Sequence, residues 1–145
     1  MNSKKQTGRK SSRRHVFTVI YQIPFHEFFD MGEALEHYFA EYAEVEQADW
    51  SYIEQVAHGT CEQAAAVDAL ISEYAIGWTF DRLAKVDLAL LRLALFELLH
   101  MPDIPTSVII SEAVELCKVY GDDGAHVFVN GLLAKAARAL REMES

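Results

Sequence analysis

Residues that interrupt helices are scarce in this 145-residue chain, which contains three prolines and seven glycines. All-β folds need such residues at their many turns, so their scarcity, together with abundant alanine, leucine and glutamate, favours helices. The alternation of apolar and polar residues that is typical of strands persists nowhere in the sequence. We therefore predict an all-α fold, and the length corresponds to about one domain.

Cysteine is also scarce: Cys61 and Cys117 are far apart and form no CxxC pair. This pattern excludes a disulfide-rich secreted scaffold and a cysteine-based zinc site, so we interpret both as small core residues in a reducing compartment. No apolar run follows the basic N-terminus, as it would in a secretory signal. The most apolar segment, residues 86–101, is too short to span a bilayer. We expect a soluble, cytoplasmic protein.

The sequence lacks the signatures of catalysis and cofactor binding. It has no glycine-rich phosphate loop, no dinucleotide fingerprint and no serine in a nucleophile elbow. No two of the six histidines lie three or four residues apart, as a helical metal site with two histidine ligands would need. Glu112 and Glu115 are three residues apart, but acids at this spacing usually form a solvated helix face. We expect no enzyme activity, no metal and no cofactor.

Positive charge is missing from a long stretch, since no lysine or arginine occurs between His15 and Phe80, where there are twelve acids. The net charge is −9, yet the first fourteen residues contain six cations and no acid, which leaves the rest of the chain at −15. Charges more than about 10 Å apart are largely screened. The basic segment can therefore attract phosphates although the whole protein is acidic. A solubilising tail without a function is the alternative.

Apolar residues at a 3.6-residue period predict helices along most of the chain. Residues 1–10 are predicted to form a flexible basic arm, and residues 11–145 a single helical domain. The first helix is expected to begin at Ser11 or Ser12 and to kink or end at Pro24, and Asp49 is expected to cap a long helix over residues 50–74. Other predicted helical segments are residues 33–42, 80–83, 85–101 and 106–120. Segment 85–101 is apolar nearly all round, and Gly121 is expected to end segment 106–120. Asp122 or Asp123 is expected to begin the last helix.

Three residues of the last helices are unusual for their positions. Arg92 lies in an otherwise apolar segment, where a buried guanidinium must be paired. Asp87, Glu97, Glu112 and Glu115 are possible partners, and contact with RNA is the alternative. Gly131 costs about 1 kcal/mol against alanine in a helix, so either tight helix packing or the close approach of a ligand should offset it. The amide of Asn130 could read a base edge or cap a neighbouring helix.

Three blocks of the sequence resemble the NusB family, in matching order and spacing. They are VDLALLRLALFEL at residues 86–98, IP at 104–105 followed by SEAVELCK at 111–118, and FVNGLL at 128–133. Arg9, Lys10, Arg13 and Tyr21 resemble the arginine-rich start of the family and the LY pair that follows it. The resemblance covers about residues 9–140, nearly the whole domain.

The resemblance implies about seven helices that form two small bundles packed together. It also implies a transcription antitermination factor that binds the single-stranded boxA element of nascent ribosomal RNA with the ribosomal protein NusE as partner. Such a complex joins RNA polymerase and suppresses termination without catalysing a reaction.

Residue by residue, the resemblance assigns phosphate contacts to the basic motif and base contacts to aromatic and polar side chains. The RNA-binding candidates are Arg9, Lys10, Arg13, Arg14, Tyr21, Asp87, Phe128 and Asn130. Tyr21 and Phe128 both lie on apolar stripes, so each could belong to the core instead of forming a stacking platform.

Two other functions remain open at this point. The chain could be a non-catalytic helical adaptor, or a homodimer, whose basic segment is only a tail. It could also correspond to the NusB-like RNA-binding domain that precedes the catalytic domain in some RNA cytosine methyltransferases, although 145 residues leave no room for a methyl-donor domain.

Overall fold

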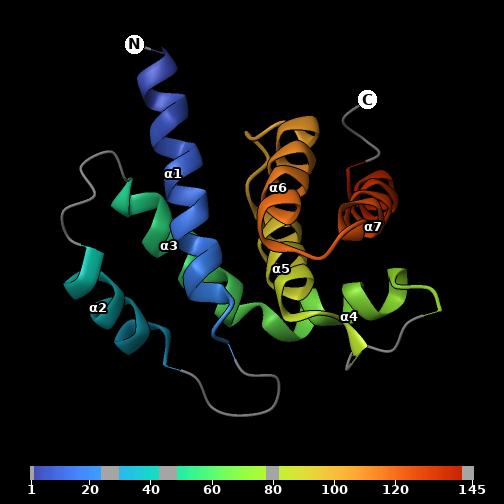
Figure 1. The fold of residues 1–145 in the computed structure, drawn as a ribbon, viewed down its shortest axis with the longest axis horizontal. Helices are drawn as coiled ribbons and strands as arrows, with labels where there is room; N and C mark the ends of the chain where they lie inside the picture. The colour runs from blue at the N-terminus through green and yellow to red at the C-terminus, as the bar shows by residue number, and fades with distance from the viewer. Residues whose placement is uncertain (1, 24–29, 43–48, 78–81, 142–145) are drawn as a thin grey trace.

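A computed structural model describes residues 2–23, 30–42, 49–77 and 82–141, and within these ranges it contains seven helices and no strand (Figure 1). The prediction of an all-α fold with about seven helices is confirmed. The helices are α1 (Asn2–Ile20), α2 (Met31–Tyr42), α3 (Trp50–Glu62), α4 (Ala64–Tyr74), α5 (Lys85–His100), α6 (Thr106–Tyr120) and α7 (Ala125–Leu140).

Helix α5 lies at the centre of the molecule, as its apolar sequence predicts. It contacts α1 and α3 on one side and α4, α6 and α7 on the other (Figure 1). Every residue from Asp87 to Leu98 is buried. The first three helices pack on one another, as do α6 and α7, so α5 is shared by two small helical bundles. This is the arrangement that the resemblance implies.

The long helix predicted over residues 50–74 is wrong, because Gln63 divides it into α3 and α4. The start of α3 is as expected: the Asp49 carboxylate accepts a hydrogen bond from the Tyr52 amide at 3.1 Å. Helix α3 packs against α1, whereas α4 reaches α7. Since α1 and α7 lie on opposite sides of α5 (Figure 1), one straight helix could not contact both, and the chain bends between them.

Two predicted helix starts also differ from the structure. Helix α1 begins at Asn2 instead of Ser11 or Ser12, and the buried Ser12 hydroxyl accepts a hydrogen bond from the Asp49 amide at 2.6 Å. Helix α7 begins after Gly124, not at Asp122 or Asp123, because Gly124 takes a left-handed φ of 81° that favours glycine.

Other boundaries agree with the sequence patterns. Gly121 ends α6 as predicted, in an extended conformation with φ −92°. The predicted kink at Pro24 and most of the helical turn predicted over residues 80–83 lie outside the described residues. None of the described helices is long and apolar enough to cross a membrane.

Candidate nucleic-acid interface

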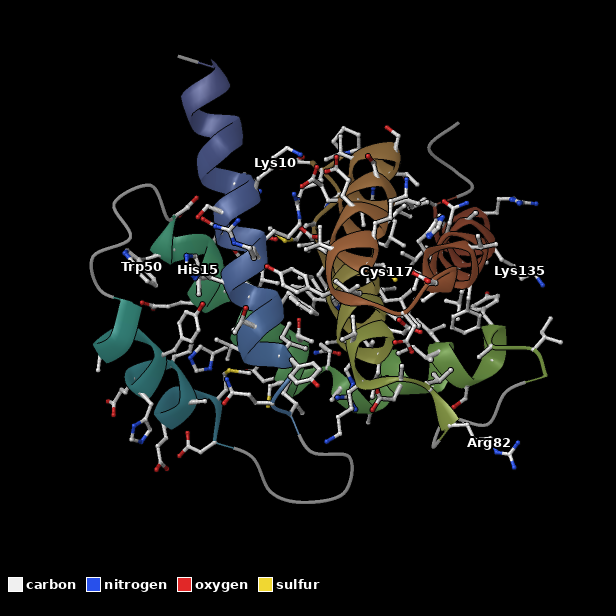
Figure 2. All side chains as sticks on the ribbon, viewed as in Figure 1. Lys10, His15, Trp50, Arg82, Cys117 and Lys135 are labelled. Atoms are coloured by element: carbon white, nitrogen blue, oxygen red, sulfur yellow. The ribbon has the colours of Figure 1, made fainter. Side chains whose placement is uncertain are left out.

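Two of the exposed basic side chains of α1 are held by acidic side chains. Lys10 reaches from α1 towards α6 (Figure 2), where its Nζ atom lies 2.8 Å from Glu112 and 3.0 Å from Glu115. These hydrogen bonds raise the pKa of Lys10, with Glu112 contributing most. The Arg9 guanidinium lies 3.7 Å from Asp49 and 4.2 Å from the centre of the Tyr52 ring. It thus has an ion pair and a cation–π contact.

Arg14 is exposed and lies one residue beyond the other cations that were assigned to RNA. Arg9 is about one third exposed at its side chain, and Lys10 more than half. All three can therefore meet a phosphate from solvent, and Arg9 and Lys10 would exchange a carboxylate partner for it.

Arg13 differs from its neighbours because its side chain is only 4% exposed. Its Nε and Nη2 atoms donate to the Glu97 carboxylate at 3.1 and 3.0 Å, and Nη1 lies 3.7 Å from Glu112. The Tyr52 hydroxyl donates to the same Glu97 carboxylate at 2.8 Å. Burial is the largest cause of a raised pKa at this hydroxyl, followed by the charge of Glu97. The structure therefore places Arg13 inside the packing of α1, α3 and α5.

Tyr21 lies on the surface just after α1 and is 44% exposed, so it is not a core residue. The buried Phe17 ring connects it to Tyr120 at the end of α6, with ring centres 6.3 Å and 5.4 Å apart. Tyr120 is 48% exposed. Two accessible aromatic rings thus flank Phe17, one just after α1 and the other at the end of α6. The sequence analysis missed Tyr120 as a binding residue, because its place on the apolar stripe of α6 indicated the core.

A hollow of about 360 Å³ lies where the starts of α5 and α7 meet, and both Asp87 and Phe128 line it. Its size is that of a small-molecule site. Phe128 is half-buried, and Asp87 is 8% exposed and accepts a hydrogen bond from Cys117 Sγ at 3.7 Å. The other lining residues are Arg82, Leu83, Ala84, Asp122, Asp123, Gly124 and Ala125.

The sequence-predicted residues, together with Tyr120, are distributed over several helices. Tyr120 precedes Gly121, where a Cβ atom would lie 3.6 Å from Asp87 Oδ1 of the hollow, and Tyr21 is linked to Tyr120 through the Phe17 ring. Lys10 lies nearer the start of α1, about 16 Å from Tyr21 along the helix axis at 1.5 Å per residue. Asn130 is exposed on α7 beyond Phe128. An interface that includes all of them extends over α1, the end of α6 and the start of α7.

Asp87 gives a testable prediction, because burial raises the pKa of its carboxyl above the usual value. Between the unfolded and the folded pKa the native state binds more protons, so stability falls as pH rises through this window. We expect Asp87→Asn, which keeps the acceptor oxygen, to raise the Tm at neutral pH and to have no such effect below the usual pKa of aspartate. Thermal unfolding at both pH values checks this, and a lower Tm at neutral pH would contradict it.

The two other unusual residues have clear surroundings. Arg92 is 2% exposed and donates two hydrogen bonds to Asp68 on α4, both at 2.8 Å, so it cross-links helices. Asp68 was not among the four acids expected, because the course of α4 after the bend, which brings Asp68 to α5, could not be read from the sequence. At Gly131, a Cβ atom would meet no described heavy atom within 4 Å. Tight packing against the described helices therefore does not explain this glycine.

Comparisons with known proteins agree with this geometry. The NusB family model matches residues 10–138. Transcription antitermination protein NusB of Agathobacter rectalis is 42% identical over 129 residues, covering 89% of this chain and 98% of that protein. The protein of the same name in Bacillus subtilis is 39% identical and covers 87% and 92%.

Solved structures show the same fold. The structure of T. maritima NusB has a TM-score of 0.79 with 35% identity, and 90% of each chain is covered. A structure of antitermination factors NusB and NusE in complex with double-stranded RNA has a TM-score of 0.80 with 25% identity, covering 92% of this chain and 98% of the matched one. Among the residues that the structure describes, no group of three potential ligands could hold a metal ion.

Proposed function

Because the chain belongs to the NusB family, we propose that it is a transcription antitermination factor and not an enzyme. In this proposal it binds boxA-type single-stranded RNA of nascent ribosomal RNA, with the ribosomal protein NusE as partner, and the complex suppresses termination by RNA polymerase in the cytoplasm. The similar structure that contains NusB, NusE and RNA supports both binding partners.

The observation that carries the proposal is the pair of accessible rings, Tyr21 and Tyr120, that flank Phe17. Single-stranded RNA is bound by stacking of its bases on aromatic side chains and by hydrogen bonds to base edges. Tyr21 and Tyr120 offer accessible rings, while Phe128 and Asp87 line the adjacent hollow. Exposed cations on α1 can bind phosphates of the same strand. These elements together fit an unpaired RNA segment.

The test is fluorescence anisotropy of a boxA-like RNA and a scrambled RNA at two salt concentrations, with and without NusE. We expect selective binding that the Arg9→Ala/Lys10→Ala/Arg14→Ala variant weakens, with a salt slope reduced by about 0.7 for each phosphate that the variant no longer binds. Lys118→Ala, an exposed cation on α6, is the control. Equal binding of both RNAs would mean that the basic segment acts only as a charged tail without sequence selectivity. No binding even with NusE would favour a helical adaptor.

The acids that hold Lys10 give a further prediction. Glu112→Gln/Glu115→Gln should raise RNA affinity about two- to fivefold, because Lys10 no longer has to leave an ion pair, and such surface pairs contribute up to about 1 kcal/mol. Glu54→Gln/Glu73→Gln changes the net charge equally at exposed positions on α3 and α4. If this control raises the affinity as much, only the net charge matters and the local competition does not exist.

A further inference from the structure

Helix α7 contains a glycine in its interior that the described part of the chain does not require for packing. Gly131 is exposed, and a Cβ atom there would meet nothing within 4 Å among the described residues. Glycine weakens a helix interior relative to alanine. In contrast, a Cβ at Gly59 would lie 2.2 Å from the Phe96 ring, so packing explains that glycine. The open space over Gly131 is therefore available to a molecule from outside.

The face of α7 around Gly131 differs in charge from the rest of the protein. The segment Ala125–Leu140 contains no acid, although the chain has 22. Val127, Asn130 and Arg138 share the exposed face of Gly131 at helical spacing, and Lys135 lies beside it. In Figure 2 Lys135 points away from the body of the molecule. This surface, which we call the α7 face, is defined by Val127, Asn130, Gly131, Lys135 and Arg138.

We propose that the α7 face binds the sugar–phosphate backbone of RNA, with the strand passing closest to the helix over Gly131. The inference rests on the proposed function and extends it beyond the hollow. Phe128 lines the hollow and lies one turn before Gly131. Lys135 and Arg138 follow Gly131 by about 6 and 10 Å along the helix.

Charge selects RNA as the occupant. Phosphates are attracted to the two cations of a helix without acids, whereas a basic protein partner would be repelled by them. The missing side chain lets the strand approach the helix, and the exposed Val127 side chain offers an apolar contact at the same face.

A graded substitution at Gly131 tests the proposal. Gly131→Ala should raise the Tm by about 2–4 °C, because alanine is the better helix former. The same variant should bind boxA-like RNA several-fold more weakly, and Gly131→Leu more weakly still. Ser72→Leu adds similar bulk at an exposed helical position on α4, away from the α7 face, and should leave RNA affinity unchanged. A gain in stability with a loss of binding cannot result from misfolding.

The two cations of the α7 face, Lys135 and Arg138, allow an independent test. Lys135→Ala/Arg138→Ala should weaken RNA binding and reduce its salt slope by about 1.4, whereas Lys118→Ala should not. Wild-type affinity in both Gly131→Leu and the double variant would overturn the inference and leave the proposed function intact. Loss of NusE binding with unchanged RNA binding would overturn it too, since the face would then belong to a protein partner. Failure of the wild-type protein to bind any RNA, even with NusE, would remove the proposed function together with this inference.

Discussion

Arg13→Ala is expected to destabilise the protein by about 3–5 kcal/mol, the range for breaking a buried ion pair at one partner. The Glu97 side chain is 1% exposed and accepts from both Arg13 and the Tyr52 hydroxyl. Without the guanidinium, its carboxylate keeps only one neutral donor among these. A buried charge without compensation is the main cost.

Urea unfolding of the variant measures this effect. Arg9→Ala is the matched control one helical turn away, since the Arg9–Asp49 pair is partly exposed at 3.7 Å and should contribute at most about 1 kcal/mol. Arg13→Met/Glu97→Gln removes both charges, and we expect it to be more stable than Arg13→Ala. Equal stability of Arg13→Ala and Arg9→Ala would show that Arg13 does not compensate a buried charge.

This expectation affects how RNA-binding data are read. Arg13 matches the basic motif of the family, yet it lies inside the helix packing. A loss of RNA binding in a variant that includes Arg13→Ala could therefore result from unfolding. For this reason the triple variant above replaces Arg14 and leaves Arg13 in place.

The second large effect is expected at Arg141, where Arg141→Ala should cost roughly 3 kcal/mol, since each hydrogen bond from a charged donor contributes about 1.5–3 kcal/mol. Its buried guanidinium donates to the carbonyl oxygens of Glu97, Leu98 and Met101 at 3.1, 2.9 and 2.9 Å, and to that of Ile104 at 2.6 Å. The last carbonyls of a helix lack partners within it. Arg141 supplies the donors at the end of α5.

Thermal and urea unfolding of Arg141→Ala and Arg141→Lys check this prediction. Lysine has a single nitrogen and cannot reach the separate acceptors of the planar guanidinium, so we expect little rescue. Arg138→Ala, at an exposed position three residues earlier, should change stability by less than about 0.5 kcal/mol. Wild-type stability of Arg141→Lys would mean that charge at the end of α5 suffices without the fork of donors.

Local patterns predicted the helices that depend on local chemistry. The Asp49 cap, the burial of α5 and the end of α6 at Gly121 all follow from side chains close in sequence. The bend at Gln63 does not, because the apolar stripe continues through it and only packing against α1 and α7 separates the two helices. The same holds for Arg141, whose carbonyl acceptors are 37 to 44 residues away.

The candidate site shows the same difference between features that depend on neighbouring residues and features that depend on distant ones. The basic segment and Phe128 could be named from the sequence and its resemblance to the family. Whether an aromatic ring lies in the core or on the surface depends on its neighbours, so Tyr21 stayed undecided and Tyr120 was not considered. The burial of Arg13 depends on Glu97, 84 residues further along the chain, which no local pattern could indicate.

The central position of α5 has a consequence for how the two bundles respond to each other. Because both take part of their core from this one helix, neither bundle can open fully without removing buried surface from the other. Local opening on one side is thereby coupled to the other side. A molecule bound to α1 should slow amide hydrogen exchange in α7, and one bound to α7 should slow it in α1. Binding at either α1 or α7 then stabilises the native structure of the other helix against local opening.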